Sequence, residues 1–340
     1  IIAALCATMS IWASSDRTLH MVAPNPQADG WSTLFAPENR PALQSALEGV
    51  HVFKLMINCI SNEFSYCAQT DWGEAGRTLQ GLNVDIGIEA GMFSGLQSRT
   101  LPNSCNGTQD ALDDLAKIAH LLETGVEPAW WTMDSLFQHT YAYPDNWTGW
   151  RFQSRSDCCN FTVTQAADAG AAYVAQIRSR LPAVRIGLNE PVPWYSVTTS
   201  NGTVFPAIGP TSPALPGYGM TGRDLPAVLR AFNDALHRLG ESPAEYFHAD
   251  QPVEFSIGEL DQGNNGYHKL GALQLEVEKL GLTFGKYFNS QDGGQQSDEL
   301  FYQRTILDAR SYAAYNNDRL PDHVIVESWF PLPSHLLPRP

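Results

Sequence analysis

Short apolar runs alternate along the chain with segments in which apolar residues recur every three or four positions. Apolar runs rich in β-branched and aromatic residues are typical of buried parallel strands, and the longer period is typical of helices that cover a sheet. The runs predict eight strands, at 20–26, 51–60, 83–91, 128–137, 184–191, 244–250, 282–290 and 323–330. The periodic segments predict helices at 40–50, 72–80, 111–125, 164–182, 224–240, 270–281 and 298–315.

Strands that alternate with helices form right-handed βαβ units, and their strands lie parallel in one sheet. Eight such units predict the α/β class and a single closed (β/α)8 TIM barrel, which suits a chain of 340 residues. An open doubly wound sheet is the alternative, although no G-x-G-x-x-G follows the first strand, as a dinucleotide-binding fold would require. Two long loops, 138–163 and 196–222, follow predicted strands on the face where barrels bind their ligands.

Composition and charge narrow the class of protein. Apolar residues make up 43% of the chain and charged residues 17%, so a large core can be buried. The net charge of −15 argues against a nucleic-acid partner, because phosphate binding needs clustered lysine and arginine. Residues 1–15 are expected to be the remnant of a signal peptide, followed by one catalytic barrel over 16–340. No later stretch is long enough to span a membrane.

Cysteines and glycosylation sequons indicate a secreted or extracellular glycoprotein. Cys59 with Cys67, and Cys105 with either Cys158 or Cys159, are expected to form disulfides in an oxidising compartment. The cysteine spacing does not resemble a zinc motif, and no metal or cofactor is expected. The N-x-S/T sequons lie at Asn106, Asn146, Asn160 and Asn201. The oligomeric state has no signal in the sequence.

Polar or ionisable residues stand at the ends of the predicted strands. Active-site residues of a (β/α)8 barrel lie at the C-terminal ends of its strands. The residues at these positions are Asn25, Asn58, Glu89, Asp134, Glu190, His248 with Asp250, Asn289, and Glu327 with Trp329. An unpaired buried charge is costly, so five carboxylates at equivalent positions predict one shared polar cleft.

A cleft of this kind suits carbohydrate chemistry. Glycosidic cleavage needs two carboxyl groups that flank the bond, and mutual repulsion among several acids can raise the pKa of one of them. Aromatic rings provide flat apolar surfaces for sugars. The side chains expected to bind substrate are Glu89, Asn189, Trp131, Trp194, Tyr195, His248, Asp250, Asn289 and Trp329.

The segment Leu188-Asn189-Glu190-Pro191 resembles the Asn-Glu-Pro motif of retaining TIM-barrel glycoside hydrolases. The resemblance implies that Glu190 is the acid/base and that a glutamate three strands later, here Glu327, is the nucleophile. Those families place the pair on strands four and seven, whereas the predicted strands here are five and eight. The Glu-Ser-Trp context of Glu327 also departs from the usual nucleophile motif.

A second assignment fits the predicted strand count. Some barrel glycosidases that act on α-linked sugars carry an aspartate nucleophile at the end of strand four, which here is Asp134, with Glu190 or Asp250 as the acid. The expected catalytic residues are therefore Glu190, Asp134 and Glu327. The expected function is hydrolysis of a poly- or oligosaccharide by a glycoside hydrolase-like enzyme.

Two other functions remain open at this point. A metal-dependent TIM-barrel sugar isomerase or epimerase could use oxygen and imidazole ligands from Glu89, Glu190, His248, Asp250 and Glu327. Neither H-x-H nor H-E-x-x-H occurs to support it. A non-catalytic carbohydrate-binding barrel would keep the aromatic residues without needing paired acids. The sequence lacks the G-x-S-x-G elbow and the phosphate-binding G-x-x-x-x-G-K-[ST] loop.

Overall fold

The computed structural model describes residues 18–22, 30–61, 67, 70–91, 105–139, 159, 161–207, 223–258, 266–328, 330 and 332. Parallel strands close into a barrel in the order β1-β10-β9-β8-β5-β4-β3-β2. These strands are β1 (Thr18–Val22), β2 (Val52–Met56), β3 (Asp85–Ala90), β4 (Trp130–Asp134), β5 (Arg185–Pro191), β8 (Tyr246–Asp250), β9 (Thr283–Phe288) and β10 (His323–Val326). The predicted TIM barrel is confirmed, and the open sheet is excluded.

The first strand is a full member of the barrel. In β1, His20 lies opposite Ile325 of β10 on one side and Val52 of β2 on the other. This strand begins two residues earlier than predicted, and 23–29 lie outside the described residues. Glu190 is therefore on the fifth strand of the barrel, and Glu327 directly follows the eighth.

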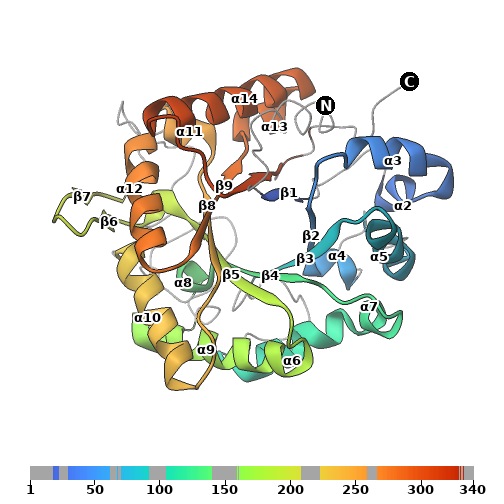
Figure 1. Ribbon diagram of the computed structural model, residues 1–340, viewed down its shortest axis with the longest axis horizontal. Helices are drawn as coiled ribbons and strands as arrows, with labels where there is room; N and C mark the ends of the chain where they lie inside the picture. Colours follow the sequence, from blue (N-terminus) through green and yellow to red (C-terminus); the bar gives the residue numbers. More distant parts are fainter. Residues whose placement is uncertain are drawn as a thin grey trace.

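The longer helices lie around the outside of the strands (Figure 1). They are α2 (Gly30–Leu34), α3 (Arg40–Ala46), α5 (Trp72–Gly81), α6 (Gly107–Lys117), α7 (Ala119–Glu123), α9 (Val163–Arg180), α10 (Leu225–Arg238), α12 (Gly266–Lys279) and α14 (Asp298–Tyr315). Local signals fix several of their starts. Thr162 and Gln165 form a capping box at α9, and the Asp224 side chain accepts from Ala227 N–H at α10.

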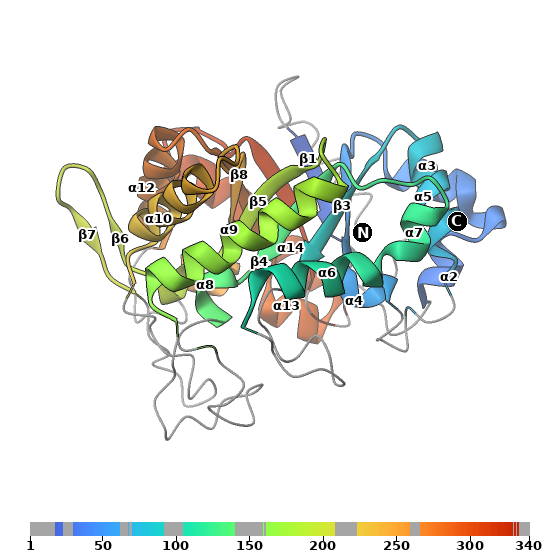
Figure 2. The same ribbon diagram turned by 90° about the horizontal axis from the view of Figure 1, so that it is seen from below.

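Three features differ from the sequence prediction. The helix expected over 111–125 is divided at Ile118 into α6 and α7. Short helices directly follow four strands: α4 (Ile57–Ile60), α8 (Leu136–His139), α11 (Val253–Ser256) and α13 (Gln291–Gln296). Figure 2 shows α4, α8 and α13 on one side of the barrel, to which the strands' carboxyl ends run. The hairpin of β6 (Val197–Thr198) and β7 (Val204–Phe205) lies where a loop was expected, and the 3-10 helices η1 (Pro37–Asn39) and η3 (Val192–Trp194) complete the described elements.

Interior and exterior positions alternate along each strand. His20 of β1 and Trp130 of β4 meet edge to face, 4.9 Å apart, although their strands are not neighbours, so both rings lie inside the barrel. Trp130 also packs against Val52 and Tyr246 in this interior. The outer strand positions instead belong to the large core shared with the helices.

Glycine 187 fixes the orientation of β5. A Cβ at Gly187 would lie 2.1 Å from the Tyr246 ring, so this position faces inward and must lack a side chain. Arg185, two residues earlier, lies over the Trp130 ring at 3.9 Å from its centroid. Successive side chains of a strand point to opposite faces, so Asn189 faces the barrel interior and Glu190 faces outward.

Both predicted disulfides are present. Cys59 is bonded to Cys67, with 5.1 Å between their Cα atoms, and Cys105 is bonded to Cys159, with 5.4 Å. The structure thus selects Cys159 over Cys158, which lies outside the described residues. Secretion and glycosylation stay predictions.

Among the described residues, no helix combines the length and apolar character needed to cross a bilayer.

Candidate active site

Four carboxylates from four strands lie at the mouth of the barrel interior. Glu89 is the penultimate residue of β3, Asp134 ends β4, Asp250 ends β8 and Glu327 directly follows β10. We call these four side chains the acid ring. Each shares the inward orientation of the residue two positions before it on its strand. The structure therefore brings together four of the five carboxylates that the sequence placed at strand ends.

Glu89 is held by a lysine and a tyrosine from other strands. Its Oε2 accepts from Lys54 Nζ of β2 at 2.5 Å and from Tyr287 Oη of β9 at 2.6 Å, and Lys54 also donates to Tyr287. Lys54 is completely buried and Glu89 is 4% exposed. Glu89 Oε1 is buried without a hydrogen-bond partner in the described part of the chain. One oxygen of Glu89 is thus held by two donors, and the other has none among the described residues.

Asp134 sits at a backbone turn that aims it inward. Its Oδ1 accepts from Ser135 Oγ at 2.9 Å and from Asn189 Nδ2 of β5 at 3.0 Å. Ser135 has a φ of 57°, in the left-handed region, and its N–H donates to the Asn189 carbonyl. Non-glycine residues in this region store strain that is common beside functional sites. Asn189 thus holds Asp134 in place, with its own Oδ1 buried and without a partner among the described residues.

Burial and repulsion between charges raise the pKa values of three members of the acid ring, Asp134, Asp250 and Glu327. The pKa of Asp134 lies well above its ordinary value, first because of desolvation and then because of the charge of Glu89. The pKa of Glu327 is raised well above its ordinary value by the same two causes, in the same order. Desolvation also raises the pKa of Asp250 to about 6. The pKa of each of these three carboxyls therefore depends on the charges of its neighbours, as expected for groups in a single site.

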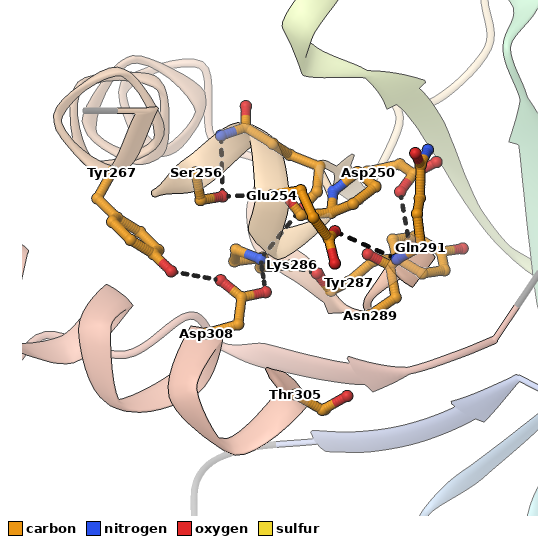
Figure 3. A network of polar contacts seen from close by, with 12 residues as sticks. Asp250, Glu254, Ser256, Tyr267, Lys286, Tyr287, Asn289, Gln291, Thr305 and Asp308 are labelled. Atoms are coloured by element: carbon orange, nitrogen blue, oxygen red, sulfur yellow. Dashed lines mark hydrogen bonds and ion pairs between the residues drawn. The ribbon is translucent and has the colours of Figure 1, made fainter. Parts of the chain in front are cut away.

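A buried polar network connects the outer face of β9 to the surrounding helices (Figure 3). Lys286 is fully buried on the outer face of β9, pairs with Asp308 of α14 at 2.6 Å and donates to the Tyr287 carbonyl at 2.8 Å. Directly after the strand, Asn289 Nδ2 donates to Asp250 Oδ1 at 3.3 Å, as Figure 3 also shows. The network anchors β9, which carries Tyr287 and leads into Asn289, to the helix layer.

Glu190 does not join the acid ring. It is completely buried, and its oxygens accept from Phe137 N–H at 2.7 Å and from Tyr195 Oη at 2.6 Å. Burial raises its pKa to about 7, although the bonds from Tyr195 and Phe137 and the charge of Arg223 act in the opposite direction. Its partners belong to α8 and to the segment at η3, so its carboxylate links β5 to two segments outside the barrel.

The aromatic candidates occupy different environments. Trp131 is fully buried on the outer face of β4, where its Nε1 donates to Tyr173 Oη of α9 at 3.1 Å. Tyr195 is fully buried against Glu190, and Trp194, on η3, is partly exposed. Trp329 lies outside the described residues.

His248 faces the barrel interior two positions before Asp250. It is completely buried, and its Nε2 lies 3.0 Å from His323 Nδ1. The structure therefore places His248 one layer deeper than the acid ring, among other aromatic rings.

Sequence reasoning missed Lys54 and Tyr287, although both touch Glu89. The available signal was a lysine inside the apolar run 51–60, four residues before Asn58 at the polar end of the predicted strand. A charge at such a position needs a partner, but the identity of that partner depends on which strands lie across the barrel.

A surface hollow among the described residues lies elsewhere. It measures about 530 Å³ and is lined by residues of α6, α7 and α9, including Leu112, Leu122 and Arg180, with no member of the acid ring. It does not coincide with the strand ends that the barrel fold uses for chemistry.

Comparisons with known proteins agree on the fold. No protein-family model and no curated protein sequence matches the chain. A GH1 β-glucosidase from Exiguobacterium antarcticum aligns at 10% identity and a TM-score of 0.53 over 92% of this chain and 88% of its own. The catalytic domain of a β-amylase from Paenibacillus polymyxa aligns at 10% identity and a TM-score of 0.51, over 92% of each chain. A D-allulose 3-epimerase from Methylomonas sp. aligns at 11% identity and a TM-score of 0.43, over 93% of this chain and 88% of its own. At these identities the likeness to the β-glucosidase and the β-amylase, both with TM-scores above 0.5, shows the TIM-barrel fold alone.

Proposed function

We propose that this protein is a glycoside hydrolase-like enzyme that cleaves glycosidic bonds of a poly- or oligosaccharide with the carboxylates of the acid ring. The observation that carries the proposal is the convergence of four inward-facing carboxylates, three of which, Asp134, Asp250 and Glu327, have pKa values raised by burial and by the charges of neighbouring members. Glycosidic hydrolysis needs one protonated and one ionised carboxyl group at the same bond. Acids in a shared buried site can hold both forms at once.

Within the ring, we assign Glu327 as the general acid and Asp134 as the nucleophile or base. Desolvation and the charge of Glu89 raise the pKa of both carboxyls, but Asp134 also accepts hydrogen bonds from Ser135 and Asn189, which favour its ionised form. Glu327 Oε2 is buried without a partner among the described residues, and desolvation with the charge of Glu89 favours its protonated form. A protonated Glu327 would donate to the leaving-group oxygen while Asp134 acts on the sugar carbon or on a water molecule.

The remaining inward side chains suit the binding of sugar hydroxyls. Glu89 Oε1 and Asn289 Oδ1 are buried acceptors without partners in the described part of the chain, so each can accept from a hydroxyl group. Asp250, held by Asn289, is a further acceptor. Trp194 offers a partly exposed ring beyond β5 for stacking on a sugar face.

Glu190 is assigned a positioning role under this proposal, in contrast to the role that the Asn-Glu-Pro resemblance implies. Its two oxygens hold α8 and Tyr195, and it faces away from the ring. Because Asn189 of the same motif supports Asp134, the motif as a whole still contributes to the site.

A metal-dependent isomerase or epimerase is the main competing function. In the described part of the chain, no three carboxylates of the ring bring their ligand atoms within 4.8 Å of one another. An open arrangement of acids fits a cleft for a substrate better than a cage of several protein carboxylates around one ion.

The test is a hydrolysis assay on a panel of glycans with the wild type, Asp134→Asn, Glu327→Gln and, as the matched control, Glu190→Gln. We expect Asp134→Asn and Glu327→Gln to lower kcat by about 10²–10⁴-fold, and Glu190→Gln to retain most activity. No cleavage of any glycan, together with metal-dependent interconversion of a free sugar, would favour the isomerase or epimerase class. Binding without cleavage of any glycan would favour a carbohydrate-binding barrel.

A further inference from the structure

Three histidines meet inside the barrel below the acid ring. They are His20 of β1, His248 of β8 and His323 of β10, and none is more than 3% exposed. One ligand nitrogen from each ring lies within 4.8 Å of the other two. In the ranges that the structure describes, this is the only set of three or more histidine, cysteine or acidic side chains with that spacing.

Three of the six ring nitrogens of this cluster lack a hydrogen-bond partner in the described part of the chain. Both ring nitrogens of His20 and Nδ1 of His248 are buried without one among the described residues. The interior of a TIM barrel is ordinarily filled by branched aliphatic side chains, and a buried polar atom without a partner is costly. Phenylalanine would make the same ring contacts with Trp130 and Tyr246, so packing alone does not call for imidazole.

The neighbouring strand leaves room for these rings. A Cβ at Gly285 of β9 would lie 2.5 Å from His248 Cδ2 and 2.9 Å from His323 Cβ. Any residue other than glycine at 285 would therefore displace two of the three imidazoles. Glycine at 285 therefore leaves the room that His248 and His323 occupy.

The three imidazoles are in the neutral form, which is the form that binds metal ions. Burial lowers the pKa of all three histidines, and the nearby charges of Lys54 and Arg185 add to the effect, so the imidazoles are neutral near pH 7. Each of those two cations already has its own counter-ion. Lys54 pairs with Glu89 at 2.5 Å, and Arg185 pairs with Glu245 at 2.9 Å.

We propose that His20, His248 and His323 form a binding site for one first-row transition metal ion in the interior of the barrel. Neutral imidazole suits zinc, copper, iron and nickel, and three histidines are a known ligand set for zinc. Tetrahedral bonds of 2.0–2.1 Å place ligand nitrogens about 3.3 Å apart. The pair of His248 and His323, at 3.0 Å, is already near that separation.

The position of the site indicates a structural role. Two of the three strands, β1 and β10, pair with each other and close the barrel, and we call this pairing the seam. A bound ion would link the seam to β8, which carries the third histidine. His248 is two residues before Asp250, so the ion would also hold the base of the acid ring. The ion would take no part in the proposed hydrolysis itself, because none of the four carboxylates of the acid ring belongs to the histidine cluster.

The experiment uses the full chain, stripped of metal by a chelator in denaturant and refolded with Co²⁺ as a spectroscopic probe. We expect one Co²⁺ per chain by elemental analysis, with visible absorption bands of a nitrogen-ligated tetrahedral ion. Refolding with Zn²⁺ should raise Tm relative to refolding with a chelator. The readouts are stoichiometry, absorption and Tm, so they stay informative if no glycan is cleaved.

Variants then locate the ion. His20→Phe and His248→Phe should each lower metal affinity by more than ~10-fold, since even changes beyond the ligands themselves lose 10–100-fold. His237→Ala, which removes an exposed imidazole from α10, is the matched control and should bind like the wild type. Absence of the Co²⁺ bands from the folded wild type would overturn the proposal whether or not the variants fold. Equal binding by the wild type and both phenylalanine variants would also overturn it, by placing the ion elsewhere.

Discussion

The outward position of Glu190 leads to a prediction for Glu190→Gln that concerns both pH and activity. In the wild type, both carboxylate oxygens accept hydrogen bonds in a fully buried site. Glutamine keeps the shape of the side chain. Its oxygen can accept from Phe137 N–H, and its amide can donate to Tyr195 Oη, so the variant should fold.

The magnitude follows from the pKa of Glu190. Burial raises this pKa from 4.5 to about 7, which corresponds to about 3 kcal/mol, because each tenfold change in proton affinity is worth about 1.4 kcal/mol. The folded state binds the proton more tightly than the unfolded state. The associated stability is fully present below pH 4.5 and is lost as the pH rises to about 7. Above pH 7, the wild type should therefore have lost about 3 kcal/mol relative to Glu190→Gln, which has no proton to release at this position.

The assay is urea unfolding of both proteins from about pH 4 to about pH 8, with the difference in unfolding free energy plotted against pH. Asp168→Asn is the control, because it removes a half-exposed carboxylate of α9 that pairs with Arg238. That variant should follow the wild-type profile closely. A flat difference curve for Glu190→Gln would refute the raised pKa. A loss of hydrolysis in folded Glu190→Gln, at the level of Asp134→Asn, would refute the outward assignment and restore Glu190 as the acid/base.

Three further predictions concern stability. Lys54→Met should lower the unfolding free energy by about 3–5 kcal/mol, because it leaves the Glu89 charge buried without its ion pair; adding Glu89→Gln should recover part of that loss. Replacing Cys105 and Cys159 by serine should cost about 4 kcal/mol, from the entropy of a loop with a sequence separation of 54. Gly187→Ala should cost about 1–3 kcal/mol, because its methyl group would overlap the facing tyrosine ring of β8. Chemical denaturation of each variant beside the wild type measures all three.

Specific results would contradict these predictions. A Lys54→Met protein as stable as the wild type would mean that Glu89 is not held as a charged partner. A serine double variant that matches the oxidised wild type would mean that the Cys105–Cys159 bond is absent in solution. For Gly187→Ala, unchanged stability would place position 187 outside the packed interior, and the orientation of the neighbouring strand-end residues would have to be reversed.

The barrel could be predicted from the sequence because its strands are short apolar runs separated by amphipathic helices. The first strand, β1, starts two residues before its predicted start. Periodicity could not show that Ile118 divides one expected helix into two, because the backbone at Ile118 (φ −97°, ψ 6°) leaves the helical conformation while the apolar spacing continues. It also missed the helices of four to six residues that follow the strands, which are too short to show a period.

The site could be predicted only in part. Strand ends identify the candidates, but the direction in which a side chain points depends on whether its position is odd or even. In β5 nearly all positions are buried, so apolar residues occupy both faces and the sequence does not reveal which face is inside. Asn189 and Glu190 are adjacent, and only one of them can face the ring. The histidine cluster left no local signal, because its members come from three strands that are distant in the chain.

The pairing of β1 with β10 has a consequence for biosynthesis. Thr18 lies opposite His323, so the two strands of this seam are separated by about 300 residues of intervening chain. At 5–20 residues per second, a ribosome needs roughly 15–60 s to make that length. During this interval one edge of β1 has no neighbour, and exposed strand edges invite pairing with other chains. A nascent chain of this protein should therefore depend on chaperones until its last barrel strand emerges.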